Sequence, residues 1–360
     1  MYTFSNKLRT FSFALIILGL LGVGYGFMTS HKSLEEVKTM LAEEASDHGG
    51  GHAEATSHEM VAGTSGEQSH VESVAEEAHH GDEHAEHVQH QIANRPWSAL
   101  YVAAFFFMMI SLGILAFYAI QIASQAGWSP VLFRVMEAIT ANLVPTSIIM
   151  LLVILSASLF HYNHLFSWMA EGIFDPTSEK YDAIVDGKSW WMNTTGWTIR
   201  GIIYLVLWNA YRFFIRKNSI AEDTANDGNK TYKKNYHASV IFLVIFMLTE
   251  SMMSWDWIMG LDPHWFSTLF GWYVLATLLV SALTVIAFVT IYLREKNVLP
   301  GINDSHIHDL AKFMFGFSVF WTYLWFAQFM LIWYADIPEE TTYFVLRFTE
   351  YKTLFLSMLV

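Results

Sequence analysis

The sequence predicts an all-α polytopic membrane protein. Hydrophobic residues make up 54% of the chain and charged residues only 15%. The apolar residues gather into blocks of about 20 residues, the length that crosses a ~30 Å hydrocarbon core as a helix. These blocks do not alternate apolar and polar residues with a period of two, as the strands of a membrane barrel would. We expect about seven complete spans and the start of an eighth.

The first apolar block, Phe11–Met28, follows the basic residues Lys7 and Arg9. A signal peptide begins in the same way. However, no small-residue cleavage pattern closes the block, and the glycines inside it are typical of a helix-packing face. We therefore expect residues 1–30 to form a retained N-terminal transmembrane helix.

Residues 31–95 form an acidic, histidine-rich tether with 14 acidic residues, three basic residues and ten histidines. With few large apolar residues the tether cannot bury a core, so disorder is expected. Its ends are candidates for short helices, one of them capped by Ser33. Histidine-rich tracts can bind metal, but no ligand spacing recurs here. A solvated linker is favoured, and no metal site is predicted.

Six further spans are expected after the tether. Pro145 lies inside the third span and should kink or locally open it. An eighth apolar run begins near Thr353 and the sequence ends at Val360, so we expect a fragment that lacks at least one span. The six complete spans are Ala99–Ile122, about Ala138–Phe160, Trp197–Ile215, about Ala238–Met259, Leu269–Tyr292 and about Leu310–Tyr334.

The basic residues predict the orientation of these spans. They concentrate before the first span, between the fourth and fifth, and after the sixth. Alternating spans place all three regions on one side, which the positive-inside rule assigns to the cytoplasm. The N-terminus is then cytoplasmic, and residues 31–95 are periplasmic.

The composition also excludes several functions. The chain has no cysteine, so it supplies no iron–sulfur ligands, no covalent c-type haem attachment and no disulfide. It carries a net charge of −13 and no basic patch of the kind that binds nucleic acid.

Glu250 lies in the middle of an apolar helix and is the first candidate for chemistry. A carboxyl near the bilayer centre costs about 2.5–3.5 kcal/mol and usually handles ions or protons. Asp256 follows about 9 Å further along the helix axis. The hydroxyls of Ser251 and Ser254, with water, could pass a proton between the two carboxyls. The alternatives are a neutral glutamic acid bonded to a neighbouring helix, or a contact with quinone.

Histidines extend this proton-path hypothesis at the predicted periplasmic side. His161 and His164 end the third span, and His264 lies in the loop after the fifth. Histidine titrates near neutral pH, which suits proton relay. Solvated or capping histidines are the alternative for the first two.

His308 and Asp309 open the seventh span and would form the cytoplasmic mouth of the path. The alternative is an ordinary helix start, capped by Ser305 or Asp304. In that case Asp309 pairs with Lys312, three residues later.

Tryptophans surround the loop after the fifth span. Aromatic faces suit a flat ring, so Trp255, Trp257, His264 and Trp265 are candidates for a quinone pocket. The alternative is that these tryptophans anchor the helices at the membrane interface.

Three motifs resemble a known family: TESMMSWDWIMGLDPHWFSTLFGWY from Thr249 to Tyr273, SHIHDLAKFMFG from Ser305 to Gly316, and the aromatic stretch from Phe320 to Glu340. Together with the tether and Asn94-Arg-Pro-Trp97, they resemble the F-type membrane subunits of alternative complex III. This bacterial inner-membrane complex is a quinol:cytochrome c oxidoreductase. The subunits belong to the polysulfide-reductase membrane-subunit (NrfD-like) family, and the resemblance covers essentially the whole chain.

The resemblance implies paired four-helix bundles, the first in residues 96–261 and an incomplete second in residues 262–360. It implies a sister NrfD-like subunit, an iron–sulfur subunit and cytochrome c subunits as partners, which would carry the iron–sulfur clusters and c-type haems. Quinol oxidation is attributed mainly to the sister subunit. This chain is then expected to contribute a proton path and scaffold, with a second quinone site or a purely structural anchor as alternatives, and a stand-alone transporter as the outside alternative.

Overall fold

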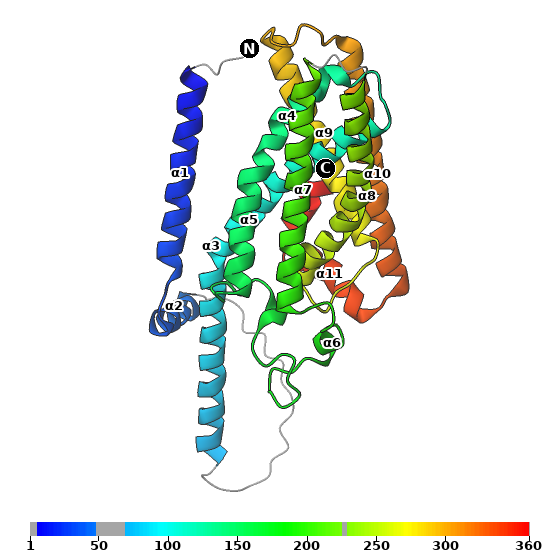
Figure 1. Cartoon of the computed structure of the whole chain (residues 1–360). Helices are drawn as coiled ribbons and strands as arrows, with labels where there is room; N and C mark the ends of the chain where they lie inside the picture. Colours follow the sequence, from blue (N-terminus) through cyan, green and yellow to red (C-terminus); the bar gives the residue numbers. More distant parts are fainter. Residues whose placement is uncertain (1–5, 48–68, 225–228, 360) are drawn as a thin grey trace. The chain divides into compact units, whose positions relative to one another are not determined.

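The computed structural model describes residues 6–47, 69–224 and 229–359. Every regular element in these residues is a helix (Figure 1). By its internal contacts the chain divides at Leu100 into a unit of residues 3–100 and a unit of residues 101–360. The two units are described separately.

The first unit contains α1 (Asn6–Ser30), α2 (Leu34–Asp47) and the beginning of α3 (Ser69–Ala123). Both described ends of the tether are therefore helical, where disorder was the main expectation. Residues 48–68 lie outside the described part. The predicted Ser33 cap is confirmed, because Ser33 and Glu36 exchange hydrogen bonds at 3.1 and 3.3 Å.

A small apolar cluster explains why the tether is helical at these ends. Val37 of α2 packs with Ala85 and Ile92 of α3, and all three side chains are buried. Apolar residues at helical spacing in α2 and α3 thus pack against each other. In α1, by contrast, an added Cβ would meet nothing within 4 Å at Gly19, Gly22 or Gly24, and at Gly26 it would lie 3.6 Å from the Pro96 side chain.

The second unit begins with the rest of α3 and contains nearly all of the expected spans. The long helices are α5 (Leu143–Ser158), α7 (Thr194–Glu222), α8 (Lys230–Met253), α9 (Phe270–Glu295) and α10 (Asp304–Ala335). Shorter helices are α4 (Phe133–Ile139), α6 (Ala183–Asp186), α11 (Pro338–Thr349) and α12 (Lys352–Leu359), with 3₁₀ turns at Pro130–Leu132, Thr140–Asn142, Ser167–Met169 and Met259–Leu261 and a π-helical turn at Ser254–Ile258.

Six helical segments of the described chain are long and apolar enough to cross a membrane, which supports a multi-pass membrane protein. The fourth expected span corresponds to α7, which has 29 residues. It is not among the six because arginines and asparagines interrupt its apolar sequence. The six segments are Asn6–Ser30, Val88–Ala123, Pro130–Ser158, Lys230–Leu261, Phe270–Glu295 and Asp304–Ala335.

Local signals set several helix boundaries. The 3₁₀ turn Thr140–Asn142 interrupts the third span just before Pro145, as expected where a proline ring crowds the carbonyl four residues earlier. The predicted caps Ser305 and Asp304 are wrong. Asn303 caps α10 instead, and His306 returns the second bond of the capping box.

The segment after Asp336 contains the amphipathic helix α11. Its proline lies in the first turn, where the absent N–H is not needed.

The helices of the second unit pack around an aromatic core. α7 contacts α5 and α8, and α9 contacts α8 and α10. Gly113 of α3 permits a close approach to α9, because a Cβ there would lie 2.6 Å from the Leu278 carbonyl oxygen. Trp197, Trp208 and Trp257 are fully buried between these helices. This core lies next to one end of the unit. That end contains α6 and the loop after α8 (Figure 1), and we call it the α6 end.

Candidate functional site

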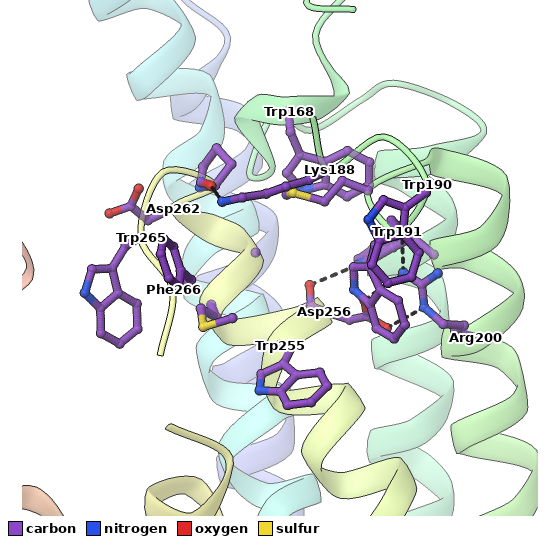
Figure 2. Close-up of a pocket in the computed structure, with 15 residues that line it drawn as sticks. Trp168, Lys188, Trp190, Trp191, Arg200, Trp255, Asp256, Asp262, Trp265 and Phe266 are labelled. Carbon is purple, nitrogen blue, oxygen red and sulfur yellow. Dashed lines mark hydrogen bonds and ion pairs between the residues drawn. The ribbon is translucent and has the colours of Figure 1, made fainter. Parts of the chain in front are cut away.

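A cavity of about 280 Å³ lies at the α6 end, between the segment that contains α6 and the loop after α8. Seven of its 15 lining residues are aromatic, and four are basic or acidic (Figure 2). It is lined by Trp168, Lys188, Trp190, Trp191, Met192, Trp197, Arg200, Trp255, Asp256, Met259, Gly260, Asp262, Pro263, Trp265 and Phe266. Concave, largely apolar sites with a few fixed polar groups are typical of small-molecule binding.

The π-helical turn Ser254–Ile258 places two of these side chains. Such turns widen the helix and disturb its regular hydrogen bonds. Neighbouring helices use the carbonyls of this turn: the Trp197 indole donates to the Asp256 carbonyl at 3.0 Å, and the Tyr101 hydroxyl donates to the Trp257 carbonyl. The turn is therefore fixed from two sides, with Trp255 and Asp256 on the cavity wall.

Asp256 is held in a buried ion pair. Arg200 donates to both of its carboxylate oxygens, at 2.9 and 2.7 Å, and the Tyr204 hydroxyl donates at 2.8 Å. The Asp256 side chain is 1% exposed. Arg200 also lies over the Trp191 ring, 4.1 Å from its centroid. A bidentate arginine–carboxylate pair of this kind fixes the positions of both side chains. The Asp256 carboxylate is therefore held in one orientation in the cavity wall.

Three of the lining tryptophans carry a buried indole N–H without a hydrogen-bond partner in the described structure: Trp168, Trp255 and Trp265. Buried donors are usually satisfied. The Trp265 ring stacks on Tyr343 of α11 at 4.2 Å. Figure 2 shows Trp168 and Trp255 on opposite sides of the cavity.

Two polar contacts connect the α6 segment to the loop after α8. Lys188 donates to the Pro263 carbonyl at 2.6 Å, and His264 Nε2 lies 2.5 Å from Asp182 Oδ2. Burial lowers the pKa of Lys188, although the carboxylates of Asp262 and Asp182 act in the opposite direction. Partial burial alone would raise the pKa of Asp182, but hydrogen bonds from the Val185 N–H, His264 and the Ile184 N–H bring it below its ordinary value.

The predicted quinone residues separate into two groups. Trp255 and Trp265 line the cavity. Trp257 lies in the aromatic core against Phe105, Tyr204 and Trp208. His264 is outside the lining and pairs with Asp182.

Glu250 is buried, with 1% of its surface exposed, and neither carboxyl oxygen has a hydrogen-bond partner in the described chain. The hydroxyls of the predicted link donate to backbone carbonyls, Ser251 to Met247 and Ser254 to Ser251, and the step through water to Asp256 stays a prediction. A buried, unpaired carboxylate is costly, so this environment favours the uncharged acid.

Of the remaining predicted residues, the three histidines are exposed and Asp309 is half-buried. His161 and His164 are exposed, and His161 adopts a left-handed conformation, φ 50°, just after α5. His308 is exposed, and Asp309 pairs with Lys312 at 3.4 Å as the alternative predicted. Among the residues that the structure describes, no group of three or more potential metal ligands occurs.

At the opposite end of the second unit, Glu137 is the centre of a polar network that the sequence did not indicate. Its buried carboxylate accepts from Tyr118 at 2.9 Å, from Arg134 at 2.8 Å, and from Arg216 and Ser219. The network joins α3, α4 and α7. These hydrogen bonds satisfy the Glu137 carboxylate fully, and the network holds the three helices together.

Arg200, Lys188 and Trp168 are site residues that the sequence reasoning missed. The sequence did contain a signal for Arg200. This arginine lies at one end of its span, and the basic loops lie at the opposite end, on the other side of the membrane. Trp190 and Trp191, adjacent aromatic residues two positions after Lys188, were a second signal. No family model matches the chain, and no curated protein sequence shows significant similarity to it.

Proposed function

We propose that the chain is an integral membrane subunit of a respiratory quinol oxidoreductase of the alternative complex III type, and that it binds a quinone ring in the cavity at the α6 end. The observation that carries this proposal is the cavity itself. Seven of its 15 lining residues are aromatic, and Lys188 and Arg200 add basic groups to the lining.

A quinone matches this arrangement in shape and in hydrogen bonding. Its flat ring stacks well on aromatic side chains. Its two carbonyl oxygens, on opposite edges of the ring, accept hydrogen bonds, and the Lys188 ammonium group on the lining can donate one. Its apolar tail extends into lipid, next to helix surfaces on which Leu261 and Trp272 are exposed.

The absence of cysteine from the chain supports a place in a larger complex. Electrons from quinol would then pass to redox centres on partner subunits: the iron–sulfur subunit and the cytochrome c subunits, beside the sister NrfD-like subunit. In this proposal the chain forms part of paired four-helix bundles in the bacterial inner membrane. The α6 end faces the periplasm, and the basic loops face the cytoplasm.

Photolabelling tests the binding site. The full chain in lipid nanodiscs would be irradiated with a short-tailed azidoquinone, and labelled peptides would be mapped by mass spectrometry. We expect labels between Trp190 and Arg200 or between Trp255 and Phe266, removed by excess decylubiquinone. Labelling that is confined to other segments, or that does not compete, would exclude the cavity as the site. Co-purification of multihaem and iron–sulfur subunits tests membership of the complex; their absence would leave a stand-alone transporter or another complex.

A proton path through Glu250 is a second candidate function. Its buried carboxyl has no partner in the described chain, as a group that exchanges protons with transient water would. Asp256 is a poor next step, because Arg200 and Tyr204 occupy its carboxylate. We expect Glu250→Gln to slow proton release by the complex in liposomes. Unchanged turnover and proton release would leave the subunit with a scaffold role at this position.

A further inference from the structure

A second cavity, of about 500 Å³, lies among α9, α10, α11 and α12. Five of its nine lining residues are aromatic. One is charged, Arg347 of α11, and among the lining residues that the structure describes none is acidic. The cavity therefore presents a single positive charge in a largely apolar lining, and its chemistry depends on what Arg347 binds.

The guanidinium of Arg347 is held in a fixed position. Its central carbon lies 3.4 Å from the centroid of the Tyr343 ring, and Nη1 donates to the Tyr343 carbonyl at 2.6 Å. The Tyr343 ring also stacks on Trp265 at 4.2 Å. A guanidinium that stacks on an aromatic ring keeps the N–H groups at its edge available as hydrogen-bond donors.

The positive charge of Arg347 has no anionic partner in the described part of the chain. A guanidinium has five N–H donors, and the bond to Tyr343 uses one of them. Glu350, three positions later, is exposed and forms no ion pair with Arg347. Arg347 is half-buried and lines the cavity. A cation that is partly removed from water and has no counter-charge favours an anion as its ligand.

The position of α11 indicates where this anion comes from. The preceding helix, α10, is long and apolar enough to cross a membrane, and the aromatic residues Trp333 and Tyr334 near its end are exposed. Such residues are typical of the membrane interface. The amphipathic helix α11 begins at Pro338 and contacts α10 and α12 (Figure 1). Amphipathic helices of this kind lie in the interface, so Arg347 lies near the level of the lipid head groups.

We propose that this cavity binds one anionic phospholipid, with the phosphate on Arg347. A guanidinium donates two parallel hydrogen bonds to two oxygens of one phosphate, and the Tyr351 hydroxyl in the lining is a further donor. The acyl chains lie over Leu346 and Leu354, which line the cavity and are 50% and 72% exposed. A zwitterionic lipid adds an ammonium group for which the lining offers no carboxylate, so an anionic head group is favoured.

Native mass spectrometry of the full chain in detergent micelles tests this site. The protein would be titrated with dioleoyl phosphatidylglycerol or dioleoyl phosphatidylcholine, and the dissociation constant of the first bound lipid would be measured. We expect phosphatidylglycerol to bind several-fold more tightly. Glycerophosphoglycerol, the same head group without acyl chains, should not displace it at equal concentration.

Substitutions connect the preference to the guanidinium. Arg347→Gln should weaken phosphatidylglycerol binding about ten-fold, the effect of losing a charge-assisted hydrogen bond. Arg347→Lys keeps the charge and loses the two-pronged geometry, so its affinity should be intermediate. Lys352→Gln is the matched control: it removes the same charge five positions away, from an exposed side chain that does not line the cavity, and the affinity should stay near the wild-type value. Circular dichroism checks that each variant is helical.

A photoactivatable phosphatidylglycerol with a diazirine on its acyl chain locates the site in the wild-type protein, whether or not the variants fold. We expect labels between Tyr343 and Ser357 that excess phosphatidylglycerol removes. Labels confined to other segments, equal affinities for the two lipids, or equal losses in Arg347→Gln and Lys352→Gln would overturn the proposal. Competition by glycerophosphoglycerol as strong as by the lipid would identify a soluble phosphate as the ligand instead. None of these results bears on the quinone cavity, which Trp265 and Tyr343 separate from this one.

Discussion

Removing the Arg200 guanidinium should destabilise the second unit strongly. In Arg200→Met the Asp256 carboxylate stays buried, 1% exposed, and loses hydrogen bonds of 2.9 and 2.7 Å, keeping only Tyr204. A buried charge that loses its partner costs about 3–5 kcal/mol. Loss of the stacking of Arg200 on Trp191, at 4.1 Å, adds about 0.5–1 kcal/mol. We expect the free energy of unfolding to fall by about 4 kcal/mol.

The assay is unfolding by SDS in mixed micelles, followed by circular dichroism. Arg212→Met is the matched control. Arg212 lies on the same helix and has no acidic partner among the described residues. This control should cost about 1 kcal/mol or less. Adding Asp256→Asn to Arg200→Met should recover about 1–3 kcal/mol relative to the sum of the single losses, because the two residues act as a pair. Equal losses for Arg200→Met and Arg212→Met would refute the reasoning.

Three further predictions concern the other carboxyl groups. Glu250→Gln should change the free energy of unfolding by less than about 1 kcal/mol, because the acid has no partner to lose; a loss of several kcal/mol in the same SDS titration would reveal a partner. Glu137→Gln should cost about 2–3 kcal/mol, since Arg134 and Arg216 lose their shared carboxylate; a neutral result would mean that the network does not contribute. The lowered pKa of Asp182 means that its stabilising bonds are present above pH ~4, the ordinary value, and are lost as the pH falls through the lower folded value. Hydrogen exchange at the Ile184 and Val185 amides should therefore lose protection on acidification, and Asp182→Asn should remove that pH dependence.

The helical membrane architecture could be predicted because a helix that lies in a bilayer needs a continuous run of apolar residues, and such runs are visible in the sequence. Each expected span coincides with a helix, and the proline in the third span lies beside a 3₁₀ turn. Interactions within a few residues were also readable, such as the Ser33 cap and the Asp309–Lys312 pair. These features depend on local spacing alone.

The positions of the polar partners could not be predicted in the same way. Arg200 and Asp256 are 56 residues apart and Lys188 and Pro263 are 75 residues apart, and no local pattern connects the members of either pair. Asp256, the predicted next step from Glu250, pairs with Arg200 on another helix, and this pairing could not be read from the sequence. Tertiary packing likewise determines that Trp257 lies in the core and Trp255 on the cavity wall.

By itself the sequence determined which segments can enter a membrane, which charges flank them, and that no cysteine is present to hold a redox centre. The tertiary structure decided which buried polar groups have partners. It braced Asp256, left Glu250 unpaired, and gathered the tryptophans of several segments around one cavity. The physical reason is that the tendency to be buried in an apolar environment is a property of each residue and can be read along the chain. A hydrogen bond or an ion pair needs a second group, and only the packing of the helices fixes the position of that group.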